Sequence, residues 1–228
     1  MPDRARNADG DDGDGTPRRW RRRKQARPQE IVAAAIDVFA ERGFAAARLD
    51  EVAGRAGVSK GTLYLYFPSK DDLFKAVVRT AILPDLEQVE AMVAADRGAV
   101  FPMLERLLRL VADRIATTRV AVVPRLVMAE AGNFPDLAAF YHREVISRGF
   151  ALLAGLLRRG VEAGEFRPLD IDHGVRLIVA PLLMGALWRG SFSGIDGAVP
   201  LDLPALVDTH IAHLRLVLLG GHEAGGVP

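Results

Sequence analysis

The segment LDEVAGRAGVSKGTLYLYFPSK, residues 49–70, predicts two short helices joined by a tight turn. Apolar residues recur at helical spacing from Leu49 to Ala56, so a first amphipathic helix is expected over 50–56. Gly57 ends this helix, because glycine enters the left-handed conformation at little cost. The segment therefore begins with a short helix and a sharp stop.

A second helix is expected over 60–67, directly after the turn. Ser59 precedes it and offers a hydroxyl that caps free N–H groups of its first turn. Pro68 ends it by disfavouring helical angles at the preceding residue, and Ser69 caps a third helix over 71–81. Two helices joined by a glycine-containing turn form the helix-turn-helix plan, whose second helix lies in the major groove of DNA.

The second helix divides into a core side and a polar side. Leu63 and Phe67 lie four residues apart and are expected in the core. Tyr66 has two open orientations, toward DNA or inward. The polar residues that offer hydrogen-bond donors are Lys60, Thr62, Tyr64 and Tyr66.

Composition points to an all-α protein without thiol chemistry. The chain has 228 residues, half of them hydrophobic, and its periodic segments lack strand alternation. It has no cysteine, so disulfides and thiolate metal sites are excluded. No run of about 18 apolar residues predicts a membrane span, and the charged N-terminus lacks the apolar core of a secretory signal. A cytoplasmic protein with no cofactor is expected.

Positive charge is concentrated before the helix-turn-helix. Residues 1–17 are rich in Gly and Asp, whereas residues 18–27, RRWRRRKQAR, hold seven cationic side chains and no acidic one. Residues 1–27 are expected to be a disordered arm, acidic and then basic. Arg21, Arg22 and Arg23 are candidates for phosphate contact, and a solvated linker is the alternative.

Two domains are expected, followed by a disordered tail over 220–228. The first, over 28–80, begins with a helix from Pro28 to Arg42 that Gly43 ends. The second, over 81–219, is entirely helical, with long helices at 135–163, 171–192 and 204–219. Pro84 interrupts the connecting helix, so movement at one end can reorient the other.

Residues 28–75 resemble the DNA-binding domain of TetR-family (tetracycline-repressor-like) transcriptional regulators. The pattern is FAERGF followed by LDEVAGRAGVSKGTLYLYFPSKDDLF, and its spacing matches throughout. The later segments PRLVMAEAGNFPDLAAFY and GEFRP resemble the C-terminal domains of such regulators more weakly. The resemblance implies an N-terminal three-helix DNA-binding domain and a larger helical domain for ligand binding and dimerisation.

The resemblance also implies site residues. Lys70 would contact a phosphate, and the recognition helix with its start would face DNA through Ser59, Lys60, Gly61, Thr62, Tyr64 and Tyr66. One position departs from the family pattern, because Arg48 stands where Ser or Thr commonly caps the first helix of the motif. Arg48 cannot cap as a hydroxyl does, so we expect it to reach a phosphate directly.

A ligand pocket is expected among the middle helices, although an apolar residue at such a position is more often simple core than a ligand contact. The candidates would suit an apolar or aromatic effector. They are Phe101, Leu104, Leu108, Val111, Met128, Phe134, Phe140, Tyr141, Met184 and Trp188.

The last two helices are apolar around their whole circumference, which fits either central core or a subunit interface. A homodimer through these helices is expected. The candidate interface residues are Val175, Ile178, Val179, Leu182, Leu206, Ile211, Leu214 and Leu218.

The expected function is a homodimeric repressor that binds a palindromic operator and is released by a small apolar or aromatic effector. The alternative is a helical small-molecule-binding protein or enzyme that uses the helix-turn-helix for protein contacts. No catalytic set is recognised, and no carboxylate or cysteine completes a metal site with His210 and His213, which are three residues apart.

Overall fold

The computed structural model describes residues 17–192, 195–197 and 199–219, with side chains described from residue 28 onward. The described residues form helices and loops, with no strand among them. The first domain comprises α1 (Pro17–Ala46), α2 (Leu49–Arg55), α3 (Lys60–Tyr66) and α4 (Lys70–Ala81). The second comprises α5 (Leu83–Ala95), α6 (Val100–Thr117), η1 (Arg119–Ala121), α7 (Val122–Glu130), α8 (Pro135–Tyr141), η2 (His142–Ile146), α9 (Ser147–Glu162), α10 (Ile171–Phe192) and α11 (Leu203–Leu219).

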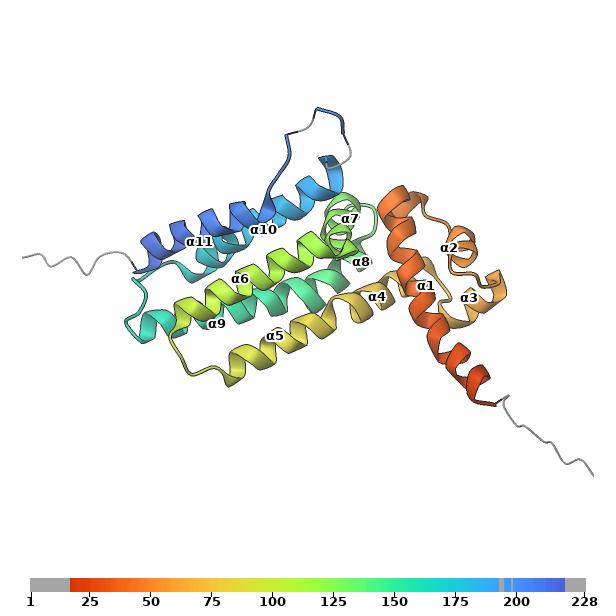
Figure 1. Ribbon diagram of the computed structural model, residues 1–228, viewed down its shortest axis with the longest axis horizontal. Coiled ribbons are helices and arrows are strands. Elements are labelled where there is room, and N and C mark those ends of the chain that lie inside the picture. The colour runs from red at the N-terminus through yellow and green to blue at the C-terminus, as the bar shows by residue number, and fades with distance from the viewer. Residues whose placement is uncertain (1–16, 193–194, 198, 220–228) are drawn as a thin grey trace, which may run out of the picture.

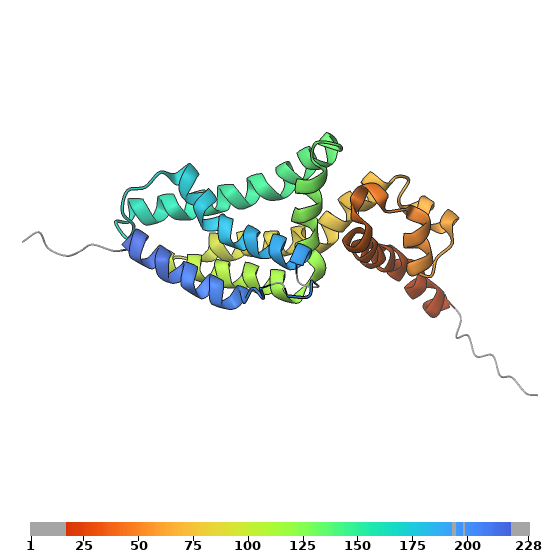
Figure 2. The same ribbon diagram turned by 90° about the horizontal axis from the view of Figure 1, so that it is seen from above.

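The molecule is elongated, with the helix-turn-helix at one end and a helical bundle at the other (Figures 1 and 2). Helices α5, α6, α9, α10 and α11 run along the bundle, while α7 and α8 lie where it meets the first domain. Helix α4 crosses this junction and leads into α5. The first domain contacts the bundle through α1 against α7 and through α4 against α8.

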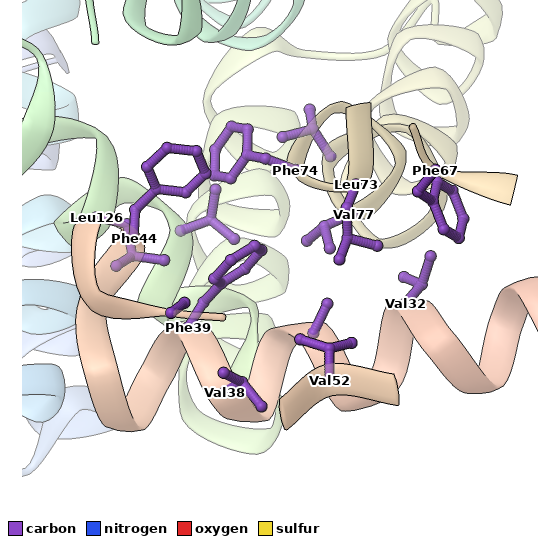
Figure 3. Close-up of a cluster of buried hydrophobic side chains, with 14 of the residues drawn as sticks. Val32, Val38, Phe39, Phe44, Val52, Phe67, Leu73, Phe74, Val77 and Leu126 are labelled. Atoms are coloured by element: carbon purple, nitrogen blue, oxygen red, sulfur yellow. The ribbon is translucent and has the colours of Figure 1, made fainter. Parts of the chain in front are cut away.

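A buried aromatic cluster holds the first domain together. Phe39 and Phe44 of α1 contact each other and Phe74 of α4, with ring centroids 5.5–6.2 Å apart. Val52 of α2 and Leu63 of α3 are fully buried beside them, and Figure 3 shows how the cluster spans α1, α2 and α4. Each side chain of this size contributes roughly 1.5–3 kcal/mol when fully buried.

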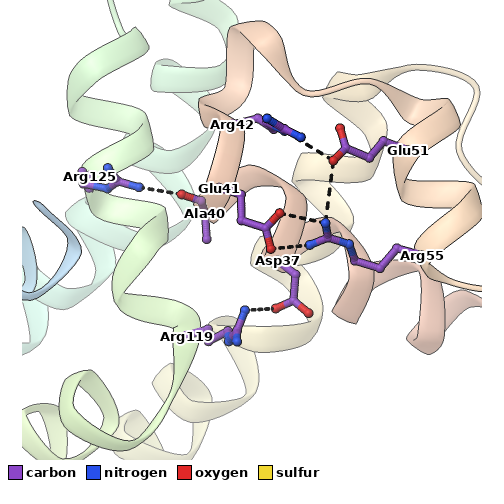
Figure 4. A network of polar contacts seen from close by, with 8 residues as sticks. All are labelled: Asp37, Ala40, Glu41, Arg42, Glu51, Arg55, Arg119 and Arg125. Atoms are coloured by element: carbon purple, nitrogen blue, oxygen red, sulfur yellow. Dashed lines mark hydrogen bonds and ion pairs between the residues drawn. The ribbon is translucent and has the colours of Figure 1, made fainter. Parts of the chain in front are cut away.

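An exposed ion pair also joins α1 to α2. The Arg55 guanidinium donates to both carboxylate oxygens of Glu41, at 2.6 and 2.7 Å (Figure 4). That hydrogen bonding lowers the pKa of Glu41. The bidentate geometry adds a specific surface contact between two helices that the buried core already packs together.

The local signals in the helix-turn-helix segment produce the expected turns. Gly43 and Gly57 have φ of 75° and 66°, the left-handed region that glycine adopts without strain. Ser59 Oγ accepts from the N–H of Thr62 at 3.1 Å, and Ser69 Oγ accepts from that of Asp72 at 3.1 Å. The predicted all-α fold is confirmed, and both serine caps form as expected.

The first helix starts earlier than predicted. Its backbone is helical from Pro17, so residues 17–27 continue α1, and Pro28 lies inside it. Arginine and lysine are good helix formers, so a basic sequence extends a helix without difficulty. The expected disordered arm is therefore wrong for residues 17–27; residues 1–16 and the predicted tail over 220–228 lie outside the described residues.

Two further helices differ from expectation. The connecting helix breaks at Ile82, and Pro84 lies in the first turn of α5, where the missing N–H costs nothing. The helix predicted from Pro135 to about Ala163 is divided into α8, the π-helical turn η2 and α9. Such π-helical turns interrupt the regular hydrogen-bond ladder and are frequent at functional sites.

Helix α10 is long and apolar enough to cross a membrane, as judged by length and composition alone. Among the described residues it is the one helix with that property. It packs against α6, α7, α9 and α11, as a helix of the bundle does. Only 28% of the most apolar 18-residue stretch of α10 is buried, so one face of the helix remains uncovered in the single chain.

Candidate nucleic-acid interface and ligand cavity

Helix α3 exposes a face made of backbone, one aromatic and one aliphatic side chain. Leu63 is fully buried, whereas Tyr64 is 41% exposed and Leu65 is 79% exposed. Gly61, Tyr64 and Leu65 stand at i, i+3 and i+4, so they share one side of the helix. Leu65 was not among the predicted contacts, although an exposed leucine in a helix-turn-helix suits a thymine methyl group.

Gly61 leaves space on this face. A Cβ placed on it would meet no atom within 4 Å, so no neighbouring side chain accounts for the glycine. Bare backbone here allows another surface to approach α3 closely. Ser59 and Thr62 bond to each other, with 2.8 Å between their hydroxyl oxygens, so both are engaged in the cap at the start of α3.

Two cations lie at the start of this face. Lys60 Nζ is 3.0 Å from Asp50 Oδ1, and this interaction raises the pKa of Lys60. The Arg48 side chain is exposed, makes no cap hydrogen bond to α2, and forms no ion pair with any residue that the structure describes. Arg48 is therefore the freer of the two cations for a phosphate.

Lys70 and Tyr66 turn toward the protein. Lys70 Nζ donates to the carbonyls of Ala45 and Ala47, at 2.8 and 3.2 Å, and lies 4.8 Å from the centre of the Phe44 ring. Burial lowers the pKa of Lys70. Tyr66 is half-buried against the aromatic core. The ammonium of Lys70 therefore holds the loop between α1 and α2, where the sequence predicted a free phosphate contact.

Arg21, Arg22 and Arg23 belong to the helical part of α1 before Pro28. Their side chains lie outside the described part of the structure. Figure 1 shows this end of α1 extending beyond α2 and α3. The basic segment is therefore carried by a helix that projects from the first domain.

A cavity of about 430 Å³ lies between the helices of the bundle, close to the first domain, and opens to solvent beside exposed residues such as Met128. Its walls come from α5, α6, α7, α9 and α10, together with the α4–α5 break and the α8–η2 turn. Four of the predicted pocket residues line it: Leu108, Val111, Met128 and Tyr141.

The other six predicted pocket residues lie elsewhere. Phe101 and Leu104 are buried in the bundle core, and Phe134 and Phe140 pack into the core of the first domain. Trp188 donates its indole N–H to the Val199 carbonyl at 3.2 Å, and Met184 is 49% exposed. Periodicity identified these residues as apolar, and only the packing of the helices decides which of them border an empty volume.

Comparison with known proteins places the chain in a family. Residues 31–77 match the family described as bacterial regulatory proteins, tetR family, and residues 94–203 match the tetracyclin repressor-like C-terminal domain. The HTH-type transcriptional regulator RutR of Escherichia coli (strain K12) is 30% identical over 179 residues, covering 78% of this chain and 82% of that protein. The chain belongs to the TetR family. It is accordingly a DNA-binding transcriptional regulator, and its relatives are regulators, not enzymes.

Solved TetR-family structures share the fold. The fatty acid degradation regulator FadR from Bacillus halodurans superimposes with a TM-score of 0.67 at 26% identity, covering 86% of this chain and 96% of that one. FadR from Bacillus subtilis, solved in complex with stearoyl-CoA, gives a TM-score of 0.68 at 22% identity, covering 85% and 99%. The division into a helix-turn-helix domain and a helical bundle is thus that of the family.

In this TetR-family chain, polar contacts fasten the DNA-binding domain to the bundle (Figure 4). Arg119 of η1 pairs with Asp37 of α1 at 2.6 Å, and Arg125 of α7 donates to the Ala40 carbonyl at 3.1 Å. A Cβ on Gly190 of α10 would lie only 3.1 Å from Arg125 Cδ. Arg125 therefore touches α1 and α10 as well as its own helix.

A second contact closes the same junction. Glu130 at the end of α7 accepts from the N–H of Ala45 at 3.1 Å and from the side-chain amide of Asn133 at 3.2 Å. Phe134 packs edge-on against Phe44, with centroids 4.8 Å apart. The junction is therefore a packed core with polar edges.

The predicted dimer residues mostly face their own bundle. Five of them are at most 5% exposed, namely Val175, Ile178, Leu182, Ile211 and Leu218. Val179 and Leu182 line the cavity, and Leu206 and Leu214 pack partly buried against the bundle core. The large apolar residues that α10 and α11 leave exposed are Leu177, Met184, Phe192, Leu216 and Val217, at 44–70%.

The histidines of α11 show no metal site. His210 Nε2 lies 3.1 Å from the Ile178 carbonyl, and burial lowers the pKa of His210. Among the described residues no group of three or more histidines, cysteines or carboxylates could hold a metal ion. His210 therefore serves the contact between α11 and α10.

Proposed function

We propose that the chain is a homodimeric repressor that binds a palindromic operator and is released by a small apolar effector. The observation that supports this most directly is the position of the cavity. Its wall includes Ala81 and Ile82 at the α4–α5 break, and Val127 and Tyr141, which also belong to the core shared with the DNA-binding domain. A molecule in the cavity would touch the elements that orient α3.

DNA reading would use the exposed face of α3. In the major groove, the Gly61 backbone would approach the duplex, while Tyr64 and Leu65 would meet phosphate, base edges or thymine methyl groups. Arg48 would bind a phosphate beside them. Ser59, Lys60 and Thr62 would contribute from the start of the helix, each after partly giving up a bond within the protein.

Attraction to DNA would come mainly from α1. Residues 28–80 carry equal numbers of cationic and acidic side chains, seven of each, so the rest of the domain adds little net charge. The seven cations of residues 18–27 then supply most of the phosphate neutralisation. The protein would work in the cytoplasm, where bacterial DNA lies.

Dimerisation would cover the exposed face of α10 and α11. Leu177, Met184, Leu216 and Val217 form an apolar surface that a second copy can bury across a two-fold axis. The resulting dimer would present two copies of α3 to successive major grooves, about 34–36 Å apart.

Release would follow from differential binding. An effector that fits one arrangement of α4, α7 and α8 better than the other shifts the population toward that arrangement. Because Ile82 and Val127 lie in the cavity wall, their displacement would change how α4 and α7 pack at the junction between the first domain and the bundle. The separation of the two α3 helices would then no longer match the operator.

The test is to select DNA fragments from a random pool with the full-length protein and sequence them. The expected result is enrichment of a palindrome with half-sites one helical turn apart, and repression of a reporter carrying that palindrome in its promoter. Binding without sequence preference, or activation of the reporter, would overturn the proposal. Catalytic turnover by a protein with no DNA affinity would favour the alternative of a helical enzyme.

A further inference from the structure

The cavity is almost entirely apolar, and its polar groups are few enough to consider individually. Of the residues that line it, only Asp85, Gln88, Arg114 and Tyr141 have polar side chains. The remaining walls are aliphatic, with Phe150 as an aromatic member. A ligand that fills this volume must be lipophilic over most of its surface.

The two charged residues neutralise each other. Arg114 Nη2 donates to Asp85 Oδ1 at 2.6 Å, and both side chains are a third or more exposed. Gln88 is exposed as well. These three residues therefore lie toward solvent, and a charged ligand would have to displace one member of the ion pair from the other.

Tyr141 is the buried polar group of the cavity. It is 6% exposed, and its hydroxyl makes no hydrogen bond with any residue that the structure describes. Burial raises the pKa of Tyr141, so the group stays a neutral donor at physiological pH. The buried side-chain atoms without a partner among the described residues are Arg125 Nε and Arg159 Nε, so the Tyr141 hydroxyl oxygen keeps accessible surface, and Tyr141 lines the cavity. A ligand in the cavity could therefore accept a hydrogen bond from it without displacing a protein partner.

The cavity is also elongated along the bundle. Its lining residues run from Tyr141 through η2 to Leu153 of α9, roughly 15–18 Å at 1.5 Å per helical residue. Tyr141, the last residue of α8, marks the end of this wall nearest the first domain, and the π-helical turn η2 follows it directly. A long ligand would thus place its acceptor at one end.

We propose that the cavity binds an elongated, uncharged lipophilic molecule whose single hydrogen-bond acceptor, a ketone, ester or hydroxyl oxygen, accepts from the Tyr141 hydroxyl. The proposal rests on the proposed function in that the bound molecule would be the effector. Tyr141 belongs both to the cavity wall and to the core shared with the first domain. The same hydrogen bond would therefore act on α8 where α8 meets α4.

The binding test uses the full-length protein and three probes of similar length. Calorimetric titration with 2-undecanone, decanoate and decylammonium compares a neutral acceptor with an anion and a cation. We expect 2-undecanone to bind at least about tenfold more tightly than either ion at pH 7.5. Tighter binding of decanoate, or no measurable binding of the ketone, would overturn the proposal.

Variants then locate the hydrogen bond. Tyr141→Phe removes only the hydroxyl and should weaken 2-undecanone binding by about two- to tenfold, the usual range for one hydrogen bond. Arg106→Gln, at an exposed position of α6 outside the cavity lining, is the control and should leave ketone affinity within about twofold. Val111→Trp fills the cavity from a partly exposed position and should abolish binding. An unchanged affinity in Tyr141→Phe, or an equal loss in Arg106→Gln, would contradict the assignment.

A DNA-release assay separates this proposal from the proposed function. If 2-undecanone binds through Tyr141 but leaves the operator complex intact, the ligand class stands and the effector role fails. If the operator is bound and then released by a charged compound that the ketone does not displace, the regulator stands and the ligand class fails. If wild type releases the operator with 2-undecanone and Tyr141→Phe needs more of it, both are supported.

Discussion

Gly61 presents bare backbone on the side of α3 that Tyr64 and Leu65 occupy. A methyl group added there meets no protein atom within 4 Å, so Gly61→Ala should fold normally. Because alanine is the better helix former, stability should stay equal or rise by up to about 1 kcal/mol. Operator affinity should nevertheless fall at least about tenfold, roughly 1.4 kcal/mol, because the methyl group lies where DNA approaches. Thermal melting and a fluorescence anisotropy titration measure the two effects.

Gly155 supplies the matched control. It is an exposed glycine in α9, far from α3, and a Cβ there also meets nothing within 4 Å. Gly155→Ala should show the same gain in stability with unchanged operator affinity. If both variants bind the operator like wild type, close approach of DNA to Gly61 is disproved.

Tyr141→Phe gives a second prediction at this scale, in the absence of any ligand. The hydroxyl has no protein partner among the described residues but keeps accessible surface, so its removal should leave the free energy of unfolding unchanged or raise it by less than about 1 kcal/mol. Urea denaturation measures the change. Tyr64→Phe, at an exposed position, is the control and should alter stability by less than about 0.5 kcal/mol. A clear destabilisation in Tyr141→Phe would mean that the hydroxyl is satisfied in the free protein.

Single residues were predictable where their role is local. Ser59 and Ser69 cap helices through atoms within three positions of themselves, so the sequence alone placed them correctly. Lys70 was not predictable in this way, because its carbonyl partners Ala45 and Ala47 lie more than 20 positions away. Leu65 was overlooked because an aliphatic side chain in a helix is expected to be buried, and only packing shows which face is left open.

The basic segment of α1 carries a prediction at the scale of an element. Three chains should be compared in operator binding across a salt series: full length, residues 17–228 and residues 28–228. Removal of residues 1–27 should flatten the slope of log affinity against log salt by several units, since each neutralised phosphate contributes about 0.9. Removal of residues 1–16 takes away five aspartates and two arginines, and should leave the slope nearly unchanged.

The three chains also distinguish the alternative, a solvated linker. If residues 28–228 keep both the affinity and the slope of the full chain, the basic segment does not contact DNA. If the slope falls equally in both truncations, the charge that matters lies before Pro17.

Helices were predictable where the hydrophobic period agrees with the positions of capping residues, glycine and proline. The sequence placed α10 over the same residues as the structure, and it placed α2, α3 and α4 within a residue or two. The sequence did not predict the η2 turn, because the apolar period runs unbroken from α8 into α9. That period does not indicate where the backbone hydrogen bonds change from the α-helical to the π-helical pattern. The sequence also placed the break at Pro84, whereas a proline is accommodated in the first turn of α5 and the chain bends at Ile82.

At the scale of the whole molecule, the apolar composition predicted a cavity and an interface. It did not distinguish the residues that line them from residues of the core. The walls of the cavity come from helices far apart in sequence, so its lining depends on their packing. Because both faces of α10 and α11 are apolar, their sequences do not indicate which face packs against the protomer's own bundle. The structure assigns one face to the protomer and leaves Leu177 and Leu216 on the other.

The exposed face of α10 and α11 gives the last prediction. Leu216 is 70% exposed, so Leu216→Glu should leave the protomer folded. In a two-fold dimer the new charge enters the interface twice, and burying unpaired carboxylates is costly. Light scattering after gel filtration should therefore show a monomer at micromolar concentration, with operator affinity at least about tenfold weaker. Ala151→Glu, on the exposed side of α9, should remain dimeric and bind DNA normally. A dimeric Leu216→Glu that binds the operator as tightly as wild type would place the interface elsewhere on the bundle.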